Sequence, residues 1–406
     1  MTDARLHSAI RTDRTGEARY AGLVARLSQG ELGFVPVLVA LLVVFIVFHL
    51  ANPYFLTPRN MSNLALQVGV LGVMALGVSL VLFVGEIDLS AGSVSGVCAV
   101  VLVLLASNFS VPGPAAIAAA VLCGAAIGWV HGKCITVIGA PSFIVTLTGL
   151  LVWQGVQRML VGNQIGQVLI DDPLVLGIAS TFMPFWLSVA VVAIIIVSSV
   201  LVCVPRWQQQ SEASRLDRLA LLGRAALFPA MSLIVVAVLS NHMGVPVLLL
   251  VLVFLALILT VMTEHTPFGV HVFAVGGNAE AARRAGINVA RTKVILFSIC
   301  SAFAAISGTI AVSRQYAVDS NTGGGNLVLD AIAAAVIGGT SLFGGRGRIP
   351  GALLGAIVIG SVANGLDLLG QSANVKSIIT GLILLAAVSV DMIARKRRIR
   401  TGAAGA

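Results

Sequence analysis

Long apolar stretches alternate with short polar ones along most of the 406-residue chain. A straight helix needs about 20 residues to cross the hydrocarbon core of a bilayer, and several of these stretches are shorter than that. We therefore predict an all-α polytopic membrane protein with about ten to twelve transmembrane helices, some of them broken or re-entrant. The apolar stretches are 33–50, 64–84, 93–107, 115–131, 143–160, 182–203, 227–240, 246–263, 294–312, 328–342, 351–366 and 376–393.

Composition supports the membrane assignment. The chain is 58% hydrophobic and 10% charged, against about 25% charged residues in soluble domains, and its mean hydropathy is +1.02. The net charge of +9 does not indicate nucleic-acid binding, because the positive residues fall in short clusters between apolar stretches. We expect the lipid bilayer to be the main solvent and nucleic acid not to be a partner.

The positive residues also predict the orientation. If the N-terminus is cytoplasmic and all twelve stretches cross, only four of the 25 Lys and Arg fall outside, namely Arg59, Arg158, Arg314 and Lys376. The positive-inside rule thus favours cytoplasmic N- and C-termini. A signal peptide is the rival interpretation of the first stretch. The long basic region before it and the missing small-residue cleavage site favour a retained helix.

This pattern divides the chain into three parts. We expect a cytoplasmic N-terminal segment (1–32), a transmembrane domain (33–393) and a basic cytoplasmic tail (394–406). Within the domain, residues 205–226 form a polar, basic insert, whose RLDRLALLGR portion is expected to be a surface amphipathic helix. The outer loop 161–181 carries the acidic pair Asp171 and Asp172, either a contact for another protein or an ordinary acidic loop.

The stretch 276–293, GGNAEAARRAGINVARTK, is a polar island that predicts one short helix over residues 279–285. Asn278 is a good N-cap, Glu280 suits the first turn, and Gly286 is placed to end the helix. Arg283 and Arg284 lie within pairing distance of Glu280. Its packing positions are all small: Ala281, Ala282 and Ala285. From the residues alone, this is either an ordinary capped loop or a helix that docks into a groove of another protein.

The stretch 85–92, GEIDLSAG, places Glu86, Asp88 and Ser90 between two apolar stretches. Acidic residues at membrane depth usually face a cavity or a partner, and flanking glycines indicate a broken helix. The alternative is a plain cytoplasmic turn in which both carboxylates meet water.

Three further residues are candidates for a translocation path. Trp153 and Gln157 share a helix face and would suit a hydroxylated solute, or else Trp153 and Arg158 anchor the outer interface. Asp330 is expected to cap its helix or to act as a gate. The five cysteines and six histidines form no metal motif, and no phosphate-binding loop is present. We therefore expect no metal site, no catalytic residues and no bound cofactor in this chain.

Four segments, in order, give the chain a specific resemblance. GEIDLSAGS, PSFIVTL, GGNAEAARRAGINVARTK and LDAIAAAVIGGTSLFGG are similar to motifs of the sugar-importing ABC permeases related to ribose and xylose permeases. The EIDLS form and the 205–226 insert most resemble the xylose permeases. The likeness covers about residues 55–393. The chain differs from the family pattern in the 161–181 loop and in the charge of 343–348.

The resemblance implies a bacterial inner-membrane permease subunit, not an enzyme. Two copies would form a path for a monosaccharide, such as xylose or a similar pentose, delivered by an extracytoplasmic binding protein. A separate ATPase, which holds ATP and Mg, would dock on the 276–293 loop. The coupling residues would be Gly277, Asn278, Glu280, Ala281, Ala282, Arg283 and Gly286, with Glu86, Asp88, Ser90, Trp153, Gln157 and Asp330 lining or gating the path. The alternative is an ion-coupled secondary sugar transporter that uses Glu86, Asp88 and Asp330. A membrane-embedded enzyme ranks last.

Overall fold

The computed structural model describes residues 35–162, 167–209, 226 and 229–400. In this part, eight helices are long and apolar enough to cross a membrane, and five further apolar helices are shorter. The predicted all-α fold is confirmed, since the strands form only two short two-stranded pairs. The N-terminal segment 1–32 and the expected amphipathic helix within the 205–226 insert lie outside the described residues.

The helices follow the predicted apolar stretches closely. In chain order they are α2 (Val35–Ala51), α3 (Pro58–Phe83), α4 (Ala91–Val103), α5 (Gly113–Lys133), α6 (Ser142–Val161), α7 (Pro173–Ser180), α8 (Phe185–Gln209), Pro229–Leu239, α10 (Val247–Glu264), α11 (Pro267–Gly277), α12 (Ala279–Arg284), α13 (Val289–Gln315), α14 (Leu327–Ile337), α15 (Ile349–Leu368) and α16 (Ala373–Arg400). Two π-helical turns, η1 (Leu104–Asn108) and η2 (Cys134–Ile138), extend α4 and α5. Neither α7 nor α11 was expected from the apolar pattern.

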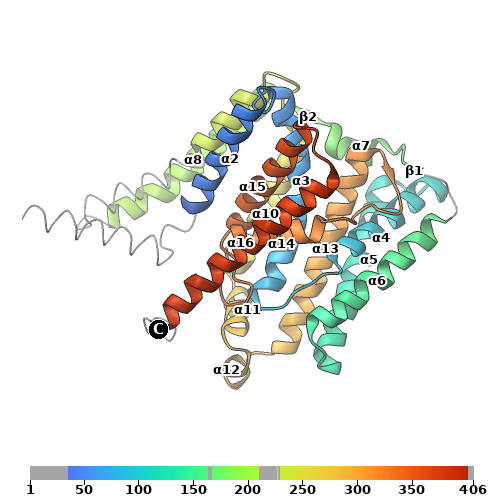
Figure 1. Ribbon diagram of the computed structural model, residues 1–406, viewed down its shortest axis with the longest axis vertical. Coiled ribbons are helices and arrows are strands. Elements are labelled where there is room, and N and C mark those ends of the chain that lie inside the picture. Colours follow the sequence, from blue (N-terminus) through green and yellow to red (C-terminus); the bar gives the residue numbers. More distant parts are fainter. Residues whose placement is uncertain (1–34, 163–166, 210–225, 227–228, 401–406) are drawn as a thin grey trace, which may run out of the picture.

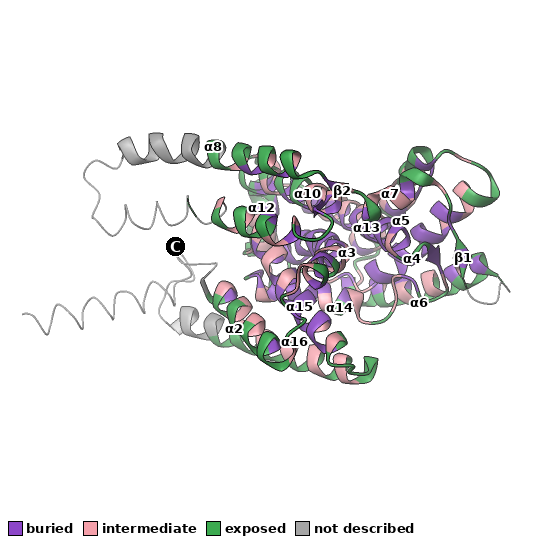
Figure 2. Cartoon of the chain, turned by 90° about the horizontal axis from the view of Figure 1, so that it is seen from above, coloured by how far each residue is buried: buried purple, intermediate pink, exposed green. Residues whose placement is uncertain are grey.

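The bundle has a central layer and an exposed periphery. Within their most apolar windows, 83% of the residues of α3 and 67% of those of α13 are buried, against 22% in α6 and none in α16. Figure 2 shows the buried helices in the middle of the molecule and the exposed ones at its edges. The helix α12 and the C-terminal end of α16 lie at the same end of the bundle (Figure 1).

Small residues bring the central helices into backbone contact. A Cβ added at Gly128 of α5 would lie 2.2 Å from the Phe297 carbonyl oxygen of α13, and Gly124 and Gly132 meet the same helix. This Gly124–Gly128–Gly132 spacing is a small-residue motif that can be read from the sequence but was not among the predicted features. Gly351 and Gly355 of α15 make a similar close approach, because they meet the backbone of Gly338 and Ala334 at the end of α14.

Short strands and a capped helix close the opposite end. Strand β1 (Val168–Leu169) pairs antiparallel with β4 (Ala317–Val318), and β2 (Phe182–Met183) with β3 (Val245–Pro246). Asp172 caps α7 by accepting hydrogen bonds from the Leu174 and Val175 amides, and it also accepts one from the Gly113 amide. Asp172, one of the expected outer acidic pair, therefore has a structural role, because its carboxylate bonds to backbone amides of its own chain.

Candidate coupling site

The helix α12 owes its two ends to its own residues. The Asn278 side chain accepts hydrogen bonds from the Glu280 and Ala281 amides, each at 3.0 Å. At the other end the Gly286 amide donates to the Arg283 carbonyl and the Ile287 amide to that of Ala282. This pair of bonds is a Schellman motif, and the left-handed backbone of Gly286 (φ 86°) permits it. The N-cap and the stop glycine are confirmed, with Ala285 as the C-cap rather than the last helical residue.

Charged side chains on α12 remain in reach of solvent. Glu280 pairs with Arg283 at 2.8 Å and with Arg284 at 3.5 Å, as the spacing predicted. The side chains of Glu280 and Arg283 are 58% and 65% exposed. These exposed pairs contribute little stability, so their charges remain available to a partner.

The alanines of α12 divide between two faces. Ala282 is 5% exposed and packs in the cluster that contains Phe83 and Val289. Ala281 and Ala285 are exposed, as are Gly277, Asn278 and Gly286. The expectation that Ala282 contacts a partner is thus wrong, because this methyl group anchors α12 to its own chain. The face of α12 that remains open to solvent carries small residues.

The polar segment 84–90 connects α3 and α4 without helical structure, as the glycines predicted. It begins next to the C-terminal end of α11, where a Cβ on Gly276 would be 1.9 Å from the Phe83 carbonyl oxygen. That oxygen accepts a hydrogen bond from the Gly345 amide at 2.9 Å. Three chain segments therefore meet here by backbone alone, and two of them, at Gly276 and Gly345, contribute a glycine without a side chain.

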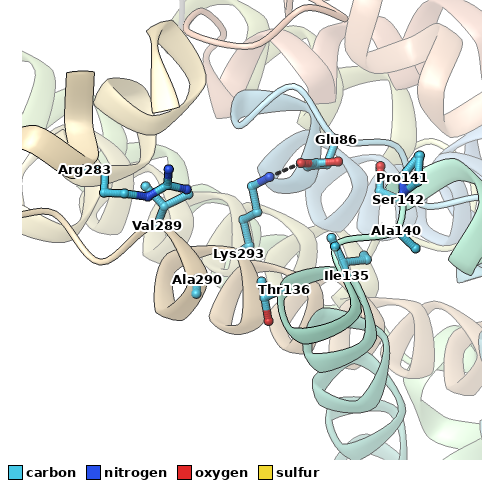
Figure 3. A pocket seen from close by; sticks show the side chains of 11 residues that line it. Glu86, Ile135, Thr136, Ala140, Pro141, Ser142, Arg283, Val289, Ala290 and Lys293 are labelled. Atoms are coloured by element: carbon cyan, nitrogen blue, oxygen red, sulfur yellow. Dashed lines mark hydrogen bonds and ion pairs between the residues drawn. The ribbon is translucent and has the colours of Figure 1, made fainter. Parts of the chain in front are cut away.

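Glu86 of this segment forms an ion pair with Lys293 in the first turns of α13. The two side chains are only 16% and 20% exposed. They border a cavity of about 360 Å³ that is also lined by Arg283, Thr136 and Ser142. Figure 3 shows the Lys293 side chain extended from α13 toward the Glu86 carboxylate.

Asp88 lies deeper and belongs to a buried polar chain. It is 1% exposed, and its Oδ1 accepts from the Ser90 amide at 2.9 Å and the Ser90 hydroxyl at 2.5 Å. Ser90 Oγ is 3.2 Å from His131 Nδ1, and Trp153 Nε1 donates to His131 Nε2 at 3.0 Å. Because an indole only donates, neutral His131 carries its proton on Nδ1 and donates it to Ser90. A plain turn with both carboxylates in water is therefore wrong.

Helix α6 completes this arrangement. The Ser142 hydroxyl accepts from the Ile87 amide at 3.3 Å, and the Thr146 hydroxyl donates to the Ile87 carbonyl at 3.2 Å. Near the other end of α6, buried Gln157 donates to the carbonyls of Asp319 and Thr322. Trp153 and Gln157 do share a face, but in this conformation both bond to the protein. The alternative of Trp153 as an interface anchor is wrong, since its indole bonds inward to His131.

Asp330 lies in the first turn of α14 and does not cap it. The N-cap residue is Asn326, and no side chain accepts a capping hydrogen bond there. The Asp330 Oδ1 atom is buried and has no hydrogen-bond partner among the described residues. The capping interpretation is therefore wrong, and the role as a gate stays a prediction.

Sequence reasoning missed His131 and did not anticipate that Lys293 would meet Glu86. A histidine in an apolar stretch gives no signal of its bonding partners. Glu86 and Lys293 are 207 residues apart, and nothing in a single sequence links them.

These features define a class of protein, a multi-pass α-helical membrane protein with an exposed capped helix at one end. Residues 60–388 match the family model described as "Branched-chain amino acid transport system / permease component". The chain belongs to this family of transport permeases, and it is a translocation subunit, not an enzyme.

Named relatives fall in the same group. The xylose transport system permease protein XylH of Haemophilus influenzae is 34% identical over 92% of this chain and 99% of its own length. XylH of Escherichia coli K12 is 35% identical over 84% of this chain and 87% of its own. The ribose import permease protein RbsC of the same strain is 32% identical over 87% and 92%. No solved structure matches the chain. The predicted resemblance to ribose and xylose permeases is confirmed.

Proposed function

We propose that this chain is the membrane-spanning permease subunit of an ATP-driven importer for a monosaccharide, driven by a separate ATPase that docks on α12. The observation that carries the proposal is the form of α12, a capped two-turn helix at one end of the bundle. Ala282 fixes its inner face, and small residues and charges cover its outer face. Because so short a helix has little stability of its own, α12 depends on its caps and on the packing of Ala282.

The distribution of charge supports a cytoplasmic position for α12. Lys133, Arg283, Arg284, Arg291 and Lys293 lie at or beside this end. At the opposite end Lys376 pairs with Asp367, and Arg314 donates to Asn63. This asymmetry fits the positive-inside rule with both termini cytoplasmic.

A second copy of the chain would pack against the face formed by α6, α14 and α16. Figures 1 and 2 agree that these helices lie along one face of the bundle. The most apolar window of α16 has none of its residues buried within one copy. A path between two copies would place Asp330, with its unpartnered oxygen, near the interface. Glu86, Asp88, Ser90, Trp153 and Gln157 would then shape the path by positioning α6.

The relatives favour a pentose as the solute. The two XylH proteins are named for xylose and the RbsC protein for ribose. We propose xylose or a similar pentose, delivered by an extracytoplasmic binding protein that makes most of the selection. ATP and Mg would bind to the ATPase partner.

Ion-coupled secondary transport is the second candidate. It is favoured by one observation, that Asp88 Oδ2 and Asp330 Oδ1 are buried with no hydrogen-bond partner in the described part of the chain. Intramembrane carboxylates with spare oxygens are typical of ion and proton carriers.

The test is co-purification of the ATPase with the tagged chain from its native membrane in mild detergent. Ala281→Trp places a bulky ring on the exposed face of α12 without a change in helical backbone. We expect the parent to retain a P-loop ATPase and Ala281→Trp to lose it. Gly286→Trp is a weaker choice, because its φ of 86° would strain α12 itself.

The matched control is Ala115→Trp, an exposed alanine at the start of α5, at the other end of the bundle and outside the face proposed for the second copy. This variant should retain the ATPase. If the parent retains no ATPase, and the purified chain alone moves sugar down a proton gradient, the secondary-transport candidate replaces the proposal.

A further inference from the structure

Residues 83–90, which are the last residue of α3 and the 84–90 segment that follows it, contact both flanks of α12. On the N-terminal flank, Gly276 at the end of α11 lies in backbone contact with Phe83. On the C-terminal flank, Lys293 in α13 forms the ion pair with Glu86. The segment therefore touches the chain just before α12 and just after it, so a displacement of α12 acts on the segment from both sides.

The Glu86–Lys293 pair differs from the other ion pairs described. The pairs of Glu280 with Arg283 and Arg284 stay within α12 and are well exposed. The Lys376–Asp367 pair joins neighbouring helices at the opposite end. Glu86 and Lys293 alone among these connect distant parts of the chain while largely shielded from water. Loss of one partner from a shielded pair leaves an uncompensated charge, so the pair favours one relative position of its two segments.

The segment continues into the helices that lie on the exposed side of the bundle. Ile87 bonds through its amide to Ser142 and through its carbonyl to Thr146, both in the first turns of α6. One and three residues after Ile87, Asp88 and Ser90 lead through His131 of α5 to Trp153 of α6. Glu86 thus lies directly beside the residues that position α6.

Apolar packing also joins α12 to this region, because Ala282 shares a buried cluster with Phe83 and Val84, and the ion pair lies beside that packing at the edge of a cavity. The cavity of about 360 Å³ separates Arg283 and Ala290, on the α12 side, from Thr136 and Ala140, at the end of η2 and before α6. Figure 3 shows the Lys293–Glu86 contact spanning this space between α13 and the 84–90 segment. Lys293 and Glu86 both line this cavity and meet in the ion pair.

We propose that the Glu86–Lys293 ion pair, beside the Gly276–Phe83 backbone contact, is the positioning link that transmits movement of α12 to the 84–90 segment and through it to α6. This inference rests on the proposed coupling of α12 to an ATPase. It assigns to Glu86 a role in transmission, and not in contact with the solute. The ion pair stays formed while α12 moves, so the 84–90 segment moves with it. The hydrogen bonds of Ile87 and Asp88 then displace α6.

The test uses the full complex of permease, ATPase and binding protein in lipid vesicles, with labelled xylose as the probe. Two rates are measured for each variant, ATP hydrolysis and sugar uptake. For Glu86→Gln and Lys293→Gln we expect uptake per ATP hydrolysed to fall about threefold to tenfold, the size of effect that coupling residues show. The ATPase remains bound and active, because the exposed face of α12 is unchanged.

Three variants separate transmission from a merely structural role. Lys293→Arg keeps the positive charge, so sugar uptake per ATP hydrolysed should equal that of the parent. The exchange of Glu86→Lys with Lys293→Glu should restore most of the loss, because the pair is rebuilt in reverse. Lys376→Gln breaks the ion pair at the opposite end and should leave uptake per ATP unchanged, even if both rates fall together.

The double variant Glu86→Gln with Lys293→Gln keeps the proposal testable if single variants fail to insert, because it leaves no unpaired charge. A normally inserted double variant with the parent ratio would overturn the link. The link would also be overturned if the single variants lowered the thermal midpoint of the complex but left uptake per ATP hydrolysed unchanged. If the parent complex itself shows no ATP-driven uptake, the proposed function has failed, and that result is distinct from failure of the link.

Discussion

Helices α13 and α6 are both long and apolar, yet they are held in the bundle by different means. Helix α13 is close-packed at the centre, and three glycines of α5 bring backbone against backbone along its length. Helix α6 is largely exposed. A few of its apolar side chains, such as Val145 and Val156, pack against the core, and polar bonds tie it at Ser142 and Thr146 near its start and at Trp153 and Gln157 further along. Close packing fixes α13 in one position, whereas a helix held by few hydrogen bonds can shift when those bonds are moved.

The largest expected effect comes from filling the glycine seam of the centre. Gly128→Leu would place side-chain atoms where a Cβ already meets the Phe297 carbonyl at 2.2 Å. The backbone must separate, at a cost at or above the upper end of overpacking, about 3 kcal/mol. We expect loss of monodisperse protein in detergent size-exclusion chromatography.

The control for that substitution lies on α6. A Cβ added at Gly155 would have no other atom within 4 Å, so the side chain of Gly155→Leu meets open space. It should change the free energy of unfolding by no more than about 0.5 kcal/mol. Equal damage from the two substitutions would contradict the distinction between a close-packed centre and a loosely held α6.

A smaller effect is expected at the far end of α6. Gln157→Leu removes both donors to the Asp319 and Thr322 carbonyls and should cost about 1–3 kcal/mol, as expected for buried groups left without partners. Hydrogen exchange should rise in residues 317–325. The control is Gln154→Leu, three residues earlier on the same helix. If this variant raised hydrogen exchange in residues 317–325 equally, Gln157 would have no special part in holding that loop.

The smallest effect is expected at the start of α6. Ser142→Ala removes the acceptor of one long hydrogen bond of 3.3 Å from the Ile87 amide. The cost should be near the lower limit for such bonds, about 0.5 kcal/mol, seen as a small fall in the thermal midpoint. A loss as large as that of Gln157→Leu would mean that the 84–90 segment, and not the outer loop, is the main support of α6.

Local features of this protein were predictable. The caps of α12, the Glu280–Arg283 spacing and the glycine at its end all depend on residues within one turn of each other. The broken segment around Gly85 followed from its glycines in the same way. The burial of Ala282 was not predictable, because a six-residue helix of small and charged residues has no apolar stripe that shows which side faces its own chain.

The sequence by itself determined that this is an all-α membrane protein, roughly where most helices lie, and which loop carries a short capped helix. These properties follow from hydropathy and from bonds between near neighbours in the chain. Only the tertiary structure decided that Glu86 pairs with Lys293, that Asp88 leads through Ser90 and His131 to Trp153, and that Asp330 is left without a partner for one oxygen. Such contacts depend on how distant helices pack, and hydropathy shows only that those helices lie in the membrane.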